Sequence, residues 1–240
     1  MTQEKSLVEA YRKHPYRNIF LGLVAVILID ALVPNYAARG LFSDLMLVAI
    51  LIVALIETVR SRQNVIWALI FGVPAIAARF IAAFRPDTTA QNTTTLMLSA
   101  MFFLFLIWNL LHDLAEENRP TGERIFGALC AYIFIGIFFA AIYAHMEYRQ
   151  PGTFAISNQG IGAATSEESS LLPVFTYYSF VTLTTLGYGD IAPVAEHART
   201  LAWLEALLGQ LYLAVMVAGF VAVHISERLI HSRGDPPPDG

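Results

Sequence analysis

The sequence is poor in charged residues and contains a single cysteine. Only 14% of its 240 residues are charged and the formal net charge is −4, so the chain has no basic surface for a nucleic acid. Cys130 lies inside an apolar run and has no second cysteine for a disulfide or a metal cluster. The whole sequence is 56% hydrophobic, which is more than a soluble domain of this size carries. We therefore expect a membrane protein without a cofactor.

The few charges are clustered, which leaves six long apolar runs. An α-helix needs about 20 apolar residues to cross roughly 30 Å of hydrocarbon. We predict an all-α membrane protein whose six transmembrane helices lie at Ile19–Val33, Leu41–Val59, Val65–Phe84, Thr94–Leu111, Ile125–Met146 and Leu201–Ile225. The first run is short and follows a basic stretch, as a secretory signal would. Because it contains Asp30 and no small-residue cleavage site follows it, we expect a retained helix.

A further apolar segment lies between the fifth and sixth predicted helices. The connection is polar from Glu147 to Ser170 and then becomes apolar and aromatic from Leu171 to Thr185. It is too short to cross and return as helices, so it is typical of a re-entrant loop, which must be sheltered by protein or by a water-filled pore.

The basic residues predict the orientation. With six crossings, ten of the 15 Lys and Arg residues fall on the side of the two termini and five on the other side or in the adjacent membrane. The positive-inside rule then puts both termini of this multi-pass protein in the cytoplasm, with the chain in the cell (plasma or inner) membrane. The re-entrant loop enters from outside.

The re-entrant segment ends in Thr184-Thr185-Leu186-Gly187-Tyr188-Gly189-Asp190. Glycine adopts positive φ without a Cβ clash, so Gly187 and Gly189 allow successive carbonyls to point to one side instead of alternating. Four such chains around an axis would form rings of oxygens able to replace the hydration shell of K⁺. The candidate K⁺-coordinating residues are Thr185, Leu186, Gly187, Tyr188 and Gly189, and the Thr185 hydroxyl would add the innermost ring.

These residues resemble the filter of the potassium channel family, whose pattern is Thr-x-Gly-Tyr-Gly-Asp. The resemblance covers Ile125 to Ile225 well and the first four helices only in number. It implies a homotetramer of identical subunits in lipid that conducts K⁺ passively, with K⁺ as the permeant ligand and no enzymatic activity. A glycine-rich turn in an extracellular loop would explain neither the aromatic segment before the motif nor its depth in the membrane.

The resemblance also assigns supporting residues. Pro173–Thr184 corresponds to the pore helix, and Pro173 suits its first turn. Val181 stands where some bacterial channels have a glutamate that pairs with the filter aspartate, so Asp190 should bond to a Tyr177 hydroxyl or a water instead. The predicted filter supports are Asp190, Tyr177, Tyr178, Thr182 and Thr184. Aromatic packing alone would also explain the presence of the two tyrosines.

The sixth predicted helix contains the candidate gate. Gly209 lies where family members often place a hinge glycine, but it equally suits close helix packing, and the sequence leaves both readings open. By its alignment with the potassium channel family, Gln210 would line the cavity. The candidate hydrophobic constriction consists of the residues that follow it at helical spacing, Leu213, Val217 and Val221.

The first four helices lack a voltage sensor. Such a sensor needs several arginines at every third position, and the fourth helix, Thr94–Leu111, contains no Lys or Arg. The channel is therefore not expected to be intrinsically voltage-gated. Intramembrane charges do occur at Asp30, Glu57, Arg79 and Glu205, and we hypothesise that Arg79 pairs with Asp30 rather than extending to an interface. The role of Glu205 stays open.

The predicted organisation has five parts. They are a cytoplasmic N-terminus (1–18), a peripheral four-helix domain (19–113), a cytoplasmic linker (114–124), a pore domain (125–225) and a disordered cytoplasmic tail (226–240). Two alternative functions are a Trk-type cation transporter subunit and a non-conducting scaffold that kept the pore fold. The transporter is disfavoured because it places four pore loops in one chain, whereas this chain has one.

Overall fold

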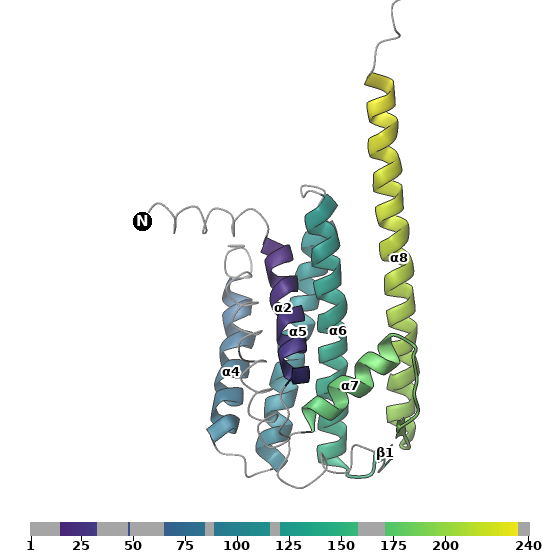
Figure 1. Cartoon of the computed structure of the whole chain (residues 1–240). Helices are drawn as coiled ribbons and strands as arrows, with labels where there is room; N and C mark the ends of the chain where they lie inside the picture. Colours follow the sequence, from purple (N-terminus) through teal and green to yellow (C-terminus); the bar gives the residue numbers. More distant parts are fainter. Residues whose placement is uncertain are drawn as a thin grey trace, which may run out of the picture.

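The computed structural model describes residues 15–32, 48, 65–84, 89–115, 121–157 and 171–234. The second predicted helix, Leu41–Val59, lies outside these residues apart from Val48. The described elements, labelled as in Figure 1, are α2 (Pro15–Leu32), α4 (Val65–Phe84), α5 (Thr89–Ala115), α6 (Thr121–Arg149), β1 (Phe154–Ile156), α7 (Leu172–Leu183), β2 (Ile191–Pro193) and α8 (Glu196–Gly234).

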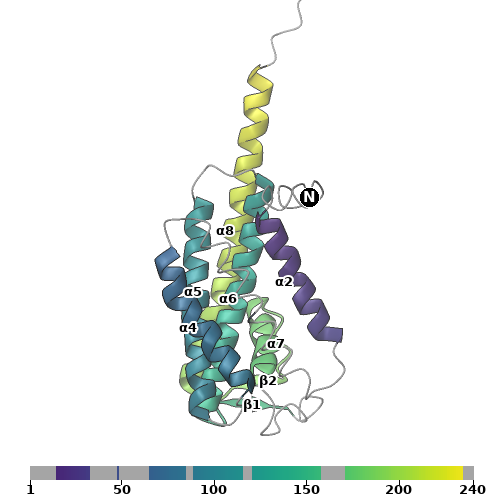
Figure 2. The same ribbon diagram turned by 90° about the vertical axis from the view of Figure 1, so that its left-hand side faces the viewer.

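The centre of the bundle is the pair α5 and α6. Helix α4 packs against α5, while α2 and α7 pack against α6. Several positions of α6 that face neighbouring helices are alanine, and small residues let helices approach closely inside a membrane. Those buried alanines are Ala128, Ala131, Ala140, Ala141 and Ala144. Helix α8 stands at the side of the bundle and extends well beyond it, as Figures 1 and 2 show.

Three helices among the described residues are long and apolar enough to cross a membrane. These spans are Thr93–Ala115 in α5, Gly122–Arg149 in α6 and Glu196–Ala222 in α8. Helix α4 contributes a shorter apolar stretch, Val65–Ile81. Length and composition therefore identify a membrane protein, with spans at the fourth, fifth and sixth positions expected from the sequence.

Helix α7 is short and lies between α6 and α8, with contacts to both (Figure 1). Its 12 residues extend roughly 18 Å, too little to cross a bilayer. Pro173 occupies its first turn, where a missing N–H leaves no hydrogen bond unmade. The helix thus begins and ends within one residue of the predicted segment Pro173–Thr184.

Two short strands tie the end of α6 to the chain that precedes α8. Strand β1 pairs antiparallel with β2, so that Phe154 lies opposite Pro193 and Ile156 opposite Ile191. The Ser157 N–H extends the pairing by donating to the Asp190 carbonyl at 2.8 Å. The sequence did not predict this sheet because three-residue strands are too short to show a period-2 pattern.

Helix α8 extends beyond the predicted helix end at Ile225. The structure has a helix through Gly234, whereas the sequence predicted a disordered tail from residue 226, so that prediction was wrong for residues 226–234. Residues 226–233 contain no proline or glycine, and the first strong stop is Gly234 followed by Asp235 and Pro236.

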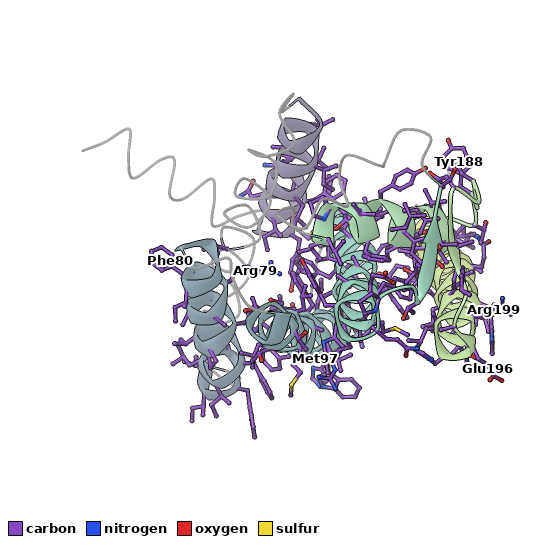
Figure 3. The ribbon with its side chains drawn as sticks, turned by 90° about the horizontal axis from the view of Figure 1, so that it is seen from below. Arg79, Phe80, Met97, Tyr188, Glu196 and Arg199 are labelled. Atoms are coloured by element: carbon purple, nitrogen blue, oxygen red, sulfur yellow. The ribbon has the colours of Figure 1, made fainter. Side chains whose placement is uncertain are left out.

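Glu123 and Arg79 are among the buried charged residues of the described part of the chain. The Glu123 carboxylate accepts a hydrogen bond from the Tyr16 N–H at 3.0 Å and so satisfies a free donor in the first turn of α2. Arg79 is buried and points from α4 into the bundle, whereas its neighbour Phe80 points outward (Figure 3). The side chain of Asp30 and all of Glu57 lie outside the described residues, so the Arg79–Asp30 pair stays a prediction.

Candidate ion pathway between α7 and α8

The segment after α7 has left-handed backbone at every second residue. The φ angles are 60° at Thr185, 59° at Gly187 and 79° at Gly189. Glycine tolerates this region, but threonine is β-branched and rarely occupies it. Hydrogen bonds hold the strained start of the segment in place: Thr185 N–H donates to the Thr182 carbonyl at 2.9 Å, and Leu186 N–H donates to the Val181 carbonyl at 2.9 Å.

Side chains from α6 and α8 reach the start of this segment. The Gln210 amide nitrogen donates to Thr185 Oγ1 at 3.1 Å, and the Tyr132 hydroxyl donates to the Leu183 carbonyl at 3.3 Å. Thr184 bonds locally, from its hydroxyl to the Phe180 carbonyl at 2.6 Å. The junction between α7 and the segment is therefore fixed by both helices that flank it.

Gly209 lies where α8 crosses the end of α7. A Cβ built there would come 2.2 Å from the Leu183 carbonyl oxygen and 3.0 Å from a Leu183 methyl carbon. Only a residue without a side chain permits this approach, so Gly209 serves close packing in this structure. Its use as a hinge stays a prediction.

In a single chain the left-handed segment is exposed. Thr184 to Gly189 are all exposed, and Leu186 and Tyr188 reach 55% and 66%. In Figure 3, Tyr188 lies at the edge of the bundle on the side away from α4. Because one chain covers only one side of the segment, it does not enclose a passage by itself.

The two neighbouring tyrosines of α7 have different surroundings. The Tyr177 hydroxyl donates to Asp190 Oδ2 at 2.8 Å, which is one of the two contacts expected for Asp190, the other being to a water. Tyr178 is buried and packs edge-to-face on the rings of Tyr143 and Phe154, with centroids 5.1 and 5.3 Å away. Tyr177 thus contacts the end of the segment, and Tyr178 belongs to the packing behind it.

The candidate gate residues lie on an open face of α8. Val217 and Val221 are exposed, Gln210 is exposed and Leu213 is half-buried. Another face of the helix holds it to α6, because the Tyr212 hydroxyl donates to the Ala128 carbonyl at 2.7 Å. The gate positions therefore remain available to a neighbouring molecule or to lipid.

Glu205 is a buried acid behind α7. The sequence identifies it as an intramembrane charge but does not indicate its role. Glu205 is completely buried, and its Oε2 accepts a hydrogen bond from the Tyr143 hydroxyl at 2.7 Å. Its Oε1 is in close contact with the Ser179 hydroxyl. Neither partner was predicted, because residues 143, 179 and 205 are far apart in the chain and no short motif connects them. Among the described residues, no group of three or more His, Cys, Asp or Glu could hold a metal ion.

Comparison with known proteins agrees with this site. Residues 148–225 match the family model described as "Ion channel", and the matched part includes α7, the left-handed segment and α8 as far as Ile225. No curated protein and no solved structure matches the chain. Residues 148–225 are thus similar to an ion-channel domain, and the apolar helices identify the chain as a membrane protein.

Proposed function

We propose that the protein is a potassium-selective channel that conducts K⁺ passively through the backbone of Thr185, Leu186, Gly187, Tyr188 and Gly189. The observation that carries the proposal is the left-handed φ at alternate residues of an exposed segment within an ion-channel domain. Alternation of this kind is the backbone conformation that turns successive carbonyl oxygens to the same side, which an extended strand does not do.

The transport step needs no covalent chemistry. A K⁺ ion exchanges its hydration shell for rings of carbonyl oxygens and moves on as neighbouring ions repel one another. The Thr185 hydroxyl adds the ring nearest the cavity, and Gln210 holds it by a hydrogen bond. At the other end, Tyr177 and Asp190 support the mouth of the filter.

Four identical subunits would complete the pore. Each chain supplies one segment with one open side, and closed rotational symmetry is the usual way to surround an axis with copies of one surface. The exposed apolar residues of α8, which include Leu211, Val215 and Val217, would then face partner subunits or lipid. The dipole of each α7 would place partial negative charge near the cavity and favour a cation there.

Sidedness and gating follow from the charges. The excess of Lys and Arg on the side of the termini supports a cytoplasmic location for both ends in the cell membrane. Helix α5 corresponds to the fourth predicted helix and has no Lys or Arg, which supports a channel without an intrinsic voltage sensor. Leu213, Val217 and Val221 are the proposed hydrophobic constriction.

Ion flux from reconstituted liposomes tests this function against its alternatives. We expect protein-dependent K⁺ efflux that Na⁺ does not match, with empty liposomes as the control. A tetramer that is correctly inserted but passes no ion would indicate the non-conducting scaffold. Flux from single, monomeric chains would indicate a transporter-like arrangement.

A further inference from the structure

Three helices of the proposed pore domain meet at Glu205. The acid comes from α8, Tyr143 from α6 and Ser179 from α7, and all three side chains are completely buried. Tyr143 and Ser179 are the hydrogen-bonding partners of Glu205, and no cation contacts it in the part of the chain that the structure describes. An ionised carboxylate without a cation is costly to bury, so the hydrogen bonds of Glu205 bear on whether it is protonated.

The contacts of Ser179 depend on the protonation state of Glu205, because Ser179 has only one hydrogen to donate. Its Oγ lies 2.7 Å from the Gly136 carbonyl oxygen of α6 and also contacts Glu205 Oε1. A serine hydroxyl has one hydrogen to donate, and a backbone carbonyl can only accept. With an ionised Glu205, one of these two contacts would bring two acceptor oxygens together with no proton between them.

A proton on Glu205 satisfies every contact in the cluster. The carboxyl O–H then donates to Ser179 Oγ, Ser179 donates to the Gly136 carbonyl, and Tyr143 donates to Oε2. The result is one continuous chain of hydrogen bonds from α8 through α7 to α6. Tyr143 of α6 adds a second, direct hydrogen bond to Glu205 of α8. Fully satisfied buried networks of this kind stiffen the elements that they join.

We propose that Glu205 is a positioning residue that carries a proton at neutral pH and fixes α7, and with it the filter, between α6 and α8. The positioning role rests on the proposed channel function, whereas the protonation state does not. The contact lies on the buried side of α7, behind Tyr178, whose ring packs on the Tyr143 ring. A displacement of α8 would therefore reach the pore helix directly through Ser179.

Infrared spectroscopy of the purified full-length protein tests the proton. In the difference between the unmodified protein and Glu205→Gln at neutral pH, we expect the C=O stretching band of a protonated carboxylic acid. Glu196→Gln is the matched control, because Glu196 is an exposed acid on the same helix, and its difference spectrum should lack that band. A difference spectrum for Glu205 that shows only ionised-carboxylate bands would overturn the protonation, whether or not the protein conducts.

Flux measurements on three variants test the positioning role. Glutamine reproduces a protonated acid, since its amide donates to Ser179 and its carbonyl accepts from Tyr143, so Glu205→Gln should keep K⁺ flux within about twofold of the unmodified protein. Glu205→Val removes the network and should lower flux by about tenfold or more. If that variant does not insert, Ser179→Ala breaks the same chain at a smaller residue, and a loss of flux is again expected. Unchanged flux in an inserted Val or Ala variant, or loss in the Gln variant, would contradict the role.

Discussion

Gly209 of α8 lies so close to the Leu183 carbonyl of α7 that a Cβ on Gly209 would come within 2.2 Å of that oxygen. Contacts shorter than about 3 Å do not occur at a real Cβ, and the obstacle is backbone, which cannot rotate away. The spacing between α8 and the end of α7 thus depends on the absence of one side chain.

Gly209→Ala should push α7 away from α8 and disturb the proposed filter that follows α7. Overpacking of this kind costs about 1–3 kcal/mol, so we expect a lower melting temperature in detergent together with reduced K⁺ flux. Gly219→Ala is the matched control, because Gly219 lies on the same helix and a Cβ there would have no other atom within 4 Å. Equal effects of the two substitutions would contradict the packing role.

Gly187→Ala should abolish selective conduction without preventing assembly. Within one chain space is not the obstacle, since nothing lies within 4 Å of a Cβ there, but a φ of 59° is left-handed backbone, which costs a residue with a side chain roughly 1–2 kcal/mol. The filter backbone should relax to a different conformation. Gly152→Ala is the control, because Gly152 has a φ of 90° and equally open surroundings in the turn before β1. Flux in Gly152→Ala should stay normal, and normal K⁺ selectivity in Gly187→Ala would show that the filter has been wrongly assigned.

Tyr177→Phe should destabilise the conducting filter. The substitution removes the hydrogen bond to Asp190, which is worth about 1 kcal/mol, and leaves the ring in place. We expect single-channel recordings to show a lower open probability. A double-mutant cycle with Asp190→Ala measures the coupling, and strictly additive effects of the two substitutions would mean that the contact does not support the filter.

Voltage should change the conductance little. Each charge that crosses the membrane field contributes about 2.3 kcal/mol per 100 mV, and α5 has no Lys or Arg to move. Macroscopic currents recorded over a wide voltage range should therefore follow the driving force. A steep conductance curve that requires several gating charges per subunit would contradict this expectation.

The sequence predicted the parts of the fold that have a strong local signal. Apolar length placed α5, α6 and α8, and the resemblance to the pore helix of potassium channels, with a proline in its first turn, placed α7 to within one residue. The Tyr177–Asp190 hydrogen bond was one of two contacts expected for Asp190, the other being to a water, because Val181 stands where some potassium channels have a glutamate partner. The membrane helices were predicted from local apolar runs, and α7 and the Asp190 contact from a short motif that resembles the potassium channel filter.

Contacts between distant residues could not be predicted in the same way. The β1–β2 sheet joins residues on either side of α7, and the Glu205 cluster joins α6, α7 and α8. A lone acid in an apolar helix indicates a buried partner, but only the packing of the helices shows that the partners are Tyr143 and Ser179. The sequence predicted too short a helix α8, because the polar residues after Ile225 give no apolar signal although the helix continues to Gly234.

The reversal potential of the purified protein in a planar bilayer, with K⁺ on one side and Na⁺ on the other, tests the central claim most directly. A filter formed by Thr185 to Gly189 predicts a current that reverses close to the K⁺ equilibrium potential and a marked loss of that selectivity in Gly187→Ala. A reversal near zero, which would mean that Na⁺ passes as readily as K⁺, would contradict the proposed function.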